Sequence, residues 1–231
     1  MALRLDHEAE EGRRQFTANV SHELRTPLTT ISGYAELLEN HLAASPEDEE
    51  KFLSLIRKEA GRMLLLVEDI LRLSQLDEGT LELKPQPVDV KRMAEDTVAA
   101  LAAKAESRDV RLSVSGHAPE VTTDATLLSE VLYNLLDNAI KYNRPGGQAE
   151  ILLDDVNGHV RIRVKDTGIG IPKEHQQKVF ERFYRVDKSR SKATGGTGLG
   201  LSIVKHAAQI LSADLRLDST PDQGTTVTVT L

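Results

Sequence analysis

Residues 194–206 read TGGTGLGLSIVKH, a run of glycines that leads directly into an apolar helical pattern. Glycines at the start of a helix leave backbone N–H groups open at its positive end, which is an arrangement that binds phosphate. The run is not a P-loop, because no Gly-Lys-Ser/Thr follows it. It is not a dinucleotide-binding fingerprint either, because Ile203 stands where a later glycine is required and no strand leads in. Taken alone, a glycine-rich loop remains weak evidence of phosphate binding.

A second cluster, NLLDNAIKYN at 134–143, places two asparagines four residues apart on one helix face. Leucines, Ala139 and Ile140 surround Asn134 and Asn138, so the face is expected to be half-buried. Neutral amide oxygens in that setting suit Mg²⁺, which keeps water ligands and bridges to phosphates. The alternative is an ordinary solvated helix face.

A third cluster, DTGIGIP at 166–172, follows a predicted strand. Gly168 and Gly170 allow the backbone to turn tightly and to approach a ligand closely. A buried carboxylate at Asp166 could accept a hydrogen bond from an exocyclic amine, such as that of adenine. The alternative is a plain strand-to-loop turn.

The segment VFERFYRVDKSRSK at 179–192 is basic in an otherwise acidic protein. Phe180 and Phe183 are its expected anchors. Its cations are Arg182, Arg185, Lys188, Arg190 and Lys192. They suit either a cationic lid over a triphosphate or a solvated surface loop.

The first third of the chain predicts two long helices. Apolar residues recur at steps of three and four over residues 8–43 and again from Phe52 to about Gly79. Ser45, Pro46 and Asp48 have the pattern of a helix start. A lone hairpin cannot bury both apolar stripes, whereas two copies can do so in a four-helix bundle, so we expect a homodimer.

From residue 80 the pattern changes. We predict a hairpin domain at 1–79, a linker at 80–87 broken by Pro85 and Pro87, and an α+β domain at 88–231. The expected helices are 88–107, 124–142 (capped by Thr123 or Asp124) and 199–211. The expected strands are VRLSVS, AEILLDDV, HVRIRVKD, DLRLDST and GTTVTVTL, with Asn157-Gly158 as a hairpin turn.

Composition excludes several classes of protein. The net charge of -7 argues against broad nucleic-acid binding. The absence of cysteine excludes disulfides and thiolate metal sites. The longest purely apolar run, MLLLV, is far shorter than the ~20 residues of a membrane span.

The stretch SHELRTPL at 21–28 is unusual for a helix built only for packing. It gathers His22, Glu23 and Thr26 and follows them with Pro27, which removes a backbone donor and weakens the helix. A lone helical histidine is structural or solvated in most proteins, so this cluster gains meaning only beside a nucleotide site.

These motifs, in this order, resemble those of sensor histidine kinases. FTANVSHELRTPLTTISGYAELL is similar to their H box, NLLDNAIKYN to the N box, DTGIGIP to the G1 box, VFERFYR to the F box and GGTGLGLSIV to the G2 box. The resemblance covers the chain from about residue 10 to its end. It implies an all-α helical hairpin that forms a dimeric four-helix bundle, followed by an α+β sandwich ATP-binding domain of the gyrase, chaperone and histidine kinase type.

The resemblance also implies roles for individual residues. In the hairpin, His22 matches the phosphorylated histidine, Glu23 the acid that orients its ring, and Thr26 the residue that positions water in members that also dephosphorylate their partner. Asn138 matches the Mg²⁺ ligand and Asp166 the adenine-reading carboxylate. The remaining ATP contacts implied are Asn134, Lys141, Tyr142, Gly168, Gly170, Arg182, Arg185, Gly196, Gly198, Leu199 and Gly200.

The resemblance thus implies an ATP- and Mg²⁺-dependent autokinase that phosphorylates His22 and passes the phosphate to an aspartate of a response regulator. The motif sequences are most similar to those of the group paired with winged-helix regulators. The stretch GYAELLEN is similar to the corresponding stretch of phosphate-responsive members. A cytoplasmic location is implied, as part of a membrane-bound sensor with missing upstream segments. Two rivals are another ATPase of the same nucleotide fold and a non-enzymatic dimeric scaffold. For Pro27 we expect a kink beside His22.

Overall fold

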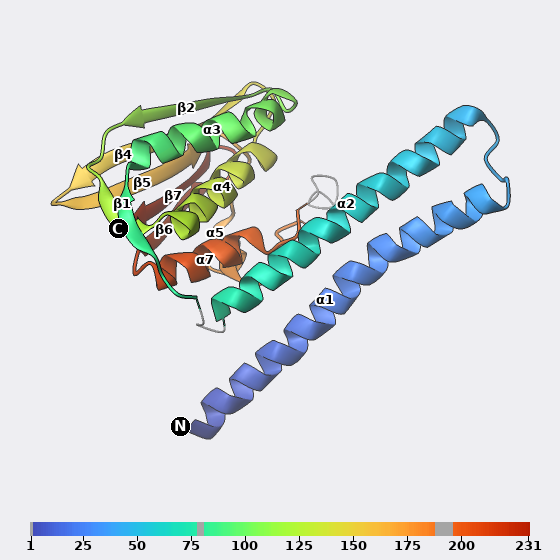
Figure 1. Cartoon of the computed structure of the whole chain (residues 1–231), viewed down its shortest axis with the longest axis horizontal. Coiled ribbons are helices and arrows are strands. Elements are labelled where there is room, and N and C mark those ends of the chain that lie inside the picture. The colour runs from blue at the N-terminus through green and yellow to red at the C-terminus, as the bar shows by residue number, and fades with distance from the viewer. Residues whose placement is uncertain (1, 78–80, 188–195) are drawn as a thin grey trace. The chain divides into compact units, whose positions relative to one another are not determined.

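The computed structural model describes residues 2–77, 81–187 and 196–231, and side chains from residue 14 on. By its contacts the chain divides into two compact units, one running to Leu71 and the other beginning at Arg72 (Figure 1). This division lies within the second long helix. The domain boundaries predicted from the sequence at 79/80 and 87/88 stay a prediction.

The first unit is built from two long helices, α1 (Ala2–Glu39) and α2 (Pro46–Asp77). Ser45 caps α2 as predicted, because the Asp48 backbone N–H donates to Ser45 Oγ at 3.2 Å. Near the connecting loop the rings of Tyr34 and Phe52 pack with their centroids 5.2 Å apart. Helix α1 is continuous through Pro27, which is buried. Pro27 therefore does not interrupt the helix, and the expected kink beside His22 stays a prediction.

The second unit is a layer of helices on one face of a five-stranded sheet (Figure 1). The strands are β2 (Val110–Gly116), β4 (Gly147–Val156), β5 (His159–Asp166), β6 (Asp214–Thr220) and β7 (Gly224–Thr230), in the order β2-β4-β5-β7-β6. Only the β2–β4 pair is parallel. The main helices are α3 (Val90–Glu106), α4 (Ala125–Lys141) and α7 (Gly200–Ile210). The predicted α+β sandwich is confirmed.

The core of this unit lies between the helices and the sheet. Its fully buried side chains include Leu128, Leu132 and Leu136 on α4, Ile151 and Ile162 on the strands, and Ile203 on α7. The predicted Asn157-Gly158 turn is confirmed, since both residues have positive φ angles, 56° and 82°. Of the two candidate caps for α4, Asp124 is the cap: its Oδ1 accepts hydrogen bonds from the Thr126 and Leu127 N–H groups, both at 3.0 Å.

The predicted linker is wrong in one respect. Pro85 and Pro87 do not break regular structure: Pro85–Val88 forms strand β1, which pairs antiparallel with β3 (Val121–Asp124). A proline can occupy an edge strand where its missing N–H is not needed by a neighbour. The short helix α5 (Lys173–Gln176) and the 3-10 turn η1 (Lys178–Phe180) were not predicted from the sequence.

No helix among the described residues is long and apolar enough to cross a membrane.

Candidate nucleotide-binding and phosphoacceptor sites

The asparagine face of α4 meets the start of α7. A Cβ atom added to Gly200 would lie 3.0 Å from Asn134 Oδ1 and 3.8 Å from Asn138 Nδ2. Asn134 also donates to the Glu130 carbonyl at 3.0 Å. The Asn138 amide has no hydrogen-bond partner within the described part of the chain, so its oxygen is open to a cation. The asparagine cluster at 134–143 and the described part of the glycine run at 194–206 therefore come together in space.

No side chain among the described residues caps the first turn of α7, so its leading N–H groups are available to a ligand. Before it, Gly198 has a φ of +78° and packs against Phe183, whose N–H donates to the Gly198 carbonyl at 2.9 Å. Arg185 Nη2 donates to the Thr197 carbonyl at 2.8 Å. Leu199 and Gly196 are buried. An open, positively polarised helix end of this kind suits the phosphates of a nucleotide.

Asp166 lies at the end of β5, with one carboxylate oxygen committed and one open. Oδ1 accepts from the Gly168 N–H at 2.8 Å and from the Thr225 N–H at 3.2 Å. No donor reaches Oδ2 from the described residues. Burial raises the pKa of Asp166 to about 6, against the opposing effect of these two N–H groups. An amine donor arriving at Oδ2 would favour the ionised carboxylate.

The loop after Asp166 is packed too tightly for side chains at its glycines. A Cβ atom on Gly168 would lie 2.3 Å from the Tyr142 carbonyl oxygen, and one on Gly170 would lie 2.0 Å from that of Thr220. Gly170 also has a φ of +66°, a conformation that favours glycine. Tyr142 ends α4 and accepts from the Ile169 N–H at 3.1 Å. The end of α4 and the glycine loop are thus one assembly.

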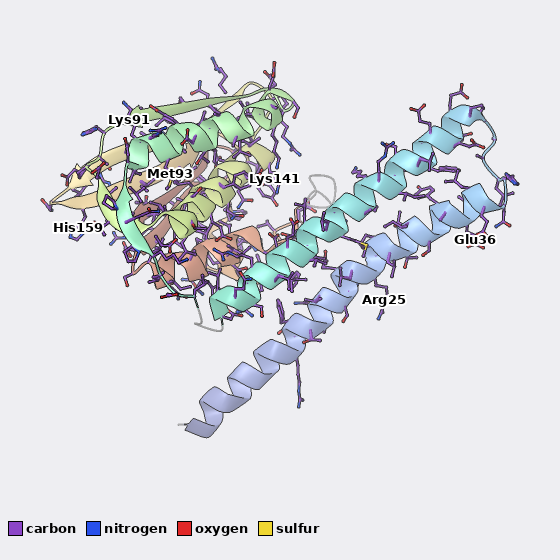
Figure 2. All side chains as sticks on the ribbon, in the orientation of Figure 1. Arg25, Glu36, Lys91, Met93, Lys141 and His159 are labelled. Atoms are coloured by element: carbon purple, nitrogen blue, oxygen red, sulfur yellow. The ribbon has the colours of Figure 1, made fainter. Side chains whose placement is uncertain are left out.

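Lys141 stands at the C-terminal end of α4 (Figure 2), where it is engaged in an ion pair. Its Nζ lies 2.6 Å from Asp137 Oδ2, and Asp137 also pairs with Lys104 of α3. Asp137 is buried, so both cations serve to neutralise it. The predicted phosphate contact of Lys141 stays a prediction and would compete with this pair.

The described part of the basic segment contacts its own unit. Arg182 Nη2 lies 2.7 Å from Asp77 Oδ1 and 3.4 Å from His206 Nε2. Phe180 and Phe183 are half-buried, as anchors should be. Lys188, Arg190 and Lys192, on which the lid prediction rests, lie outside the described residues.

In the first unit, His22 is exposed on α1. Thr26, one turn later, donates from Oγ1 to the His22 backbone carbonyl at 3.4 Å. The Glu23 carboxylate lies 3.4 Å from Arg62 Nη2 of α2. The histidine is therefore open to a second molecule, and the predicted contact between Glu23 and its ring stays a prediction.

Comparison with known proteins assigns both units. The profile of the His Kinase A (phospho-acceptor) domain matches residues 12–79, and that of the histidine kinase-, DNA gyrase B- and HSP90-like ATPases matches residues 123–231. The chain belongs to the sensor histidine kinases. The two profiles thus cover most of the hairpin and most of the second unit.

Individual histidine kinases support this assignment. The chain is 38% identical to the sensor histidine kinase WalK of Bacillus subtilis, over 96% of this chain and 37% of that protein. It is 37% identical to WalK of Staphylococcus saprophyticus, over 97% of this chain and 37% of that protein. The chain thus spans little more than a third of the length of these relatives. The resemblance to phosphate-responsive members stays a prediction.

Solved histidine kinases have the same fold. The structure of full-length ShkA in complex with AMPPNP matches with a TM-score of 0.67 and 29% identity, over 94% of this chain and 45% of that one. The histidine kinase AdeS of Acinetobacter baumannii matches with a TM-score of 0.72 and 23% identity, over 91% of this chain and 96% of that one.

Two contributors to the candidate nucleotide site were not predicted from the sequence. One is the Thr225 N–H on Asp166, which depends on the turn at Gly224, where a Cβ atom would lie 2.0 Å from the Asp166 carbonyl oxygen. The other is Arg144, whose side chain reaches the glycine loop. An arginine three residues beyond the end of a helix was the available signal for Arg144.

Proposed function

We propose that this chain is an ATP-dependent protein-histidine autokinase that phosphorylates His22 and passes the phosphate to an aspartate of a response regulator. The observation that carries the proposal is the approach of Gly200 to Asn134 and Asn138, 3.0 Å and 3.8 Å from an added Cβ. It joins an open helix end, suited to phosphate, to open amide oxygen, suited to Mg²⁺. The exposed His22 supplies an acceptor.

The nucleotide is held at its two ends. Asp166 accepts a hydrogen bond from the adenine amine at its open oxygen, and the N–H groups at the start of α7 face the phosphates. Bound Mg²⁺ neutralises phosphate charge during transfer. Asn138 would be its protein ligand, because its amide lies beside the start of α7 and has no hydrogen-bond partner among the described residues. ShkA, 29% identical, was solved in complex with AMPPNP.

His22 is the nucleophile. A ring nitrogen attacks the γ-phosphorus, the bond to the bridging oxygen breaks, and ADP leaves. Phosphoryl transfer needs mainly positioning and charge neutralisation, so an exposed imidazole on a helix is sufficient as an acceptor. In the reaction that we propose, Glu23 orients the His22 ring. The same exposure lets a regulator's aspartate approach the phosphohistidine.

The partners are a second copy of the chain and the response regulator. The hairpin leaves large apolar side chains exposed in the single chain, among them Leu28, Leu53, Leu64, Leu65 and Leu71. Apolar surface of this extent on a helical hairpin suits a four-helix bundle with a second copy.

The test is incubation with γ-labelled ATP and Mg²⁺. Wild type and His117→Gln, a control at an exposed histidine of the other unit, should be labelled alike. Neither His22→Gln nor Asn138→Asp should be labelled. Label that persists in His22→Gln would remove the acceptor assignment. Absence of label from every version would favour a non-enzymatic dimeric scaffold. ATP hydrolysis without any labelled protein would favour another ATPase of the same nucleotide fold.

We also propose that Thr26 serves dephosphorylation of the regulator, because it lies one turn after His22 on the same helix. Thr26→Ala should slow loss of phosphate from the phosphorylated regulator by roughly tenfold or more, with His22 labelling unchanged. Thr29→Ala is the matched control, since Thr29 is exposed and bonds only the Arg25 carbonyl among the described residues. Equal phosphate loss in Thr26→Ala and wild type would overturn this role.

A further inference from the structure

We propose that Arg144 is a positioning residue for adenine recognition, which it serves by fixing the loop that carries Asp166, Gly168 and Gly170. The inference rests on the proposed nucleotide site. Arg144 lies three residues beyond the end of α4, outside the five motifs of the histidine kinase pattern.

The Arg144 guanidinium donates to three backbone carbonyls in two different loops. Nε donates to the Thr167 carbonyl at 2.7 Å, and Nη2 donates to the Gly168 carbonyl at 3.0 Å and to the Asp222 carbonyl. These acceptors lie 23, 24 and 78 residues away along the chain. A single side chain therefore ties the end of α4 to the adenine loop and to the β6–β7 turn.

The contact between Arg144 and Gly168 affects the Asp166 carboxylate, the group that we propose to recognise adenine. Gly168, whose carbonyl Arg144 holds, donates its N–H to Asp166 Oδ1 at 2.8 Å. The Gly168 N–H also shares its peptide plane with the Thr167 carbonyl, which Arg144 Nε contacts at 2.7 Å. Together these contacts fix the donor and, through it, the direction in which Asp166 Oδ2 points. Arg144 need not touch the nucleotide to have this effect.

The two loops that Arg144 joins also contact each other directly. The Asp222 N–H donates to the Ile169 carbonyl at 2.8 Å, and Gly170 approaches the Thr220 carbonyl so closely that an added Cβ would lie 2.0 Å away. A small shift of the β6–β7 turn would therefore displace the adenine loop. The three hydrogen bonds that Arg144 donates oppose such a shift.

Arginine suits this task better than lysine. Its planar guanidinium carries five donors in a fixed fork, whereas lysine offers one compact ammonium on a flexible stem. Among the described residues Arg144 pairs with no carboxylate, and its neutral carbonyl acceptors give it a positioning role and no charge-pairing role. Lysine at this position should keep one or two of the contacts and recover only part of the effect.

The experiment measures the binding of MgATP and MgGTP to the full chain by calorimetry. It also measures the initial rate of His22 labelling as a function of ATP concentration. Arg144→Gln should raise the dissociation constant and the KM for ATP by roughly tenfold, the loss of about one charged hydrogen bond. The rate constant of His22 labelling at saturating ATP should stay within about twofold of the wild-type value. The preference for ATP over GTP should narrow, since the loop that reads the exocyclic amine is loosened. Arg144→Lys should lie between Arg144→Gln and wild type.

Arg216→Gln is the matched control, because Arg216 is an exposed arginine that pairs with Asp214. It should bind ATP like wild type. In a double-mutant cycle with Asp166→Asn, Arg144→Gln should add little further loss, because both changes remove the same interaction.

Wild-type affinity and ATP preference in folded Arg144→Gln would overturn the positioning role and leave the proposed function intact. Full additivity with Asp166→Asn, or an equal loss for ATP and GTP, would also overturn it, because the effect would then not pass through adenine reading. Failure of wild type itself to bind MgATP would overturn the proposed nucleotide site. A melting temperature measured without nucleotide separates all of these outcomes from unfolding.

Discussion

Asp166 is a carboxylate whose surroundings suit the bound state better than the free one. Burial raises its pKa to about 6, and the N–H groups of Gly168 and Thr225 offset only part of that effect. An adenine amine at Oδ2 would add a third donor to the ionised form. Ligand binding and ionisation of Asp166 should therefore favour each other.

This linkage predicts that ATP affinity falls in mild acid. The ionised form accepts the amine, whereas a proton on Oδ2 would turn that oxygen into a donor. The binding contribution of Asp166 is thus present above pH 6 and lost as the pH falls below it, with the dissociation constant rising up to about tenfold per pH unit. Calorimetric titration of MgATP between pH 5 and pH 8 measures the effect.

The matched comparison is Asp166→Asn, which cannot ionise. It should bind ATP weakly at all of these pH values, without the inflection near pH 6. The same inflection in Asp166→Asn would assign the titration to the nucleotide phosphates and to another group.

At the scale of the element, α4 is the helix on which the nucleotide site depends, and its start is fixed by one carboxylate. Asp124 Oδ1 caps the first turn, while Oδ2 accepts from the Lys84 N–H at 3.0 Å. Burial opposes ionisation of Asp124. The three N–H groups and the nearby Arg72 charge outweigh it and hold the pKa of Asp124 below its ordinary value.

Asp124→Ala should lower the stability of the second unit by about 1–2 kcal/mol, because the helix loses its cap. Asp124→Asn, which can still cap, should lose less. Since the folded-state pKa is lowered, the charge contribution is present above the ordinary pKa of an aspartate and is lost as the pH falls through the lowered value. Calorimetric melting at pH 7 and in acid measures both effects. Equal melting of Asp124→Ala and wild type at pH 7 would contradict the capping role.

Elements with local causes could be predicted from the sequence. Ser45 and Asp124 cap helices through neighbours two or three residues away, and Asn157-Gly158 forms its turn by its own backbone preference. Strand β1 and the contacts of Arg144 could not, because their partners are distant in the chain: Pro85 pairs with Asp124, and Arg144 reaches Asp222. The candidate nucleotide site was visible as motifs, whereas the groups that hold it together were not.

At the scale of the whole molecule, the hairpin leaves an apolar stripe on α2 uncovered in the single chain. Leu53, Leu64, Val67 and Leu71 are 51%, 60%, 39% and 58% exposed. Their spacing of eleven, three and four residues places them on one helix face. We expect this stripe to form the interface of the proposed dimer, in which a charge placed on the stripe would have to be buried.

Leu64→Arg should therefore convert the dimer to a monomer, with a dissociation constant raised by roughly a thousandfold, because each of two copies loses about 2 kcal/mol of apolar burial. Sedimentation velocity over a range of protein concentrations measures this shift. The control is Leu65→Arg, the same change at a leucine that is 54% exposed but lies about a third of a turn away from the stripe. It should remain dimeric. A dimeric Leu64→Arg, or a monomeric Leu65→Arg beside it, would show that the second copy packs on a different face of the hairpin.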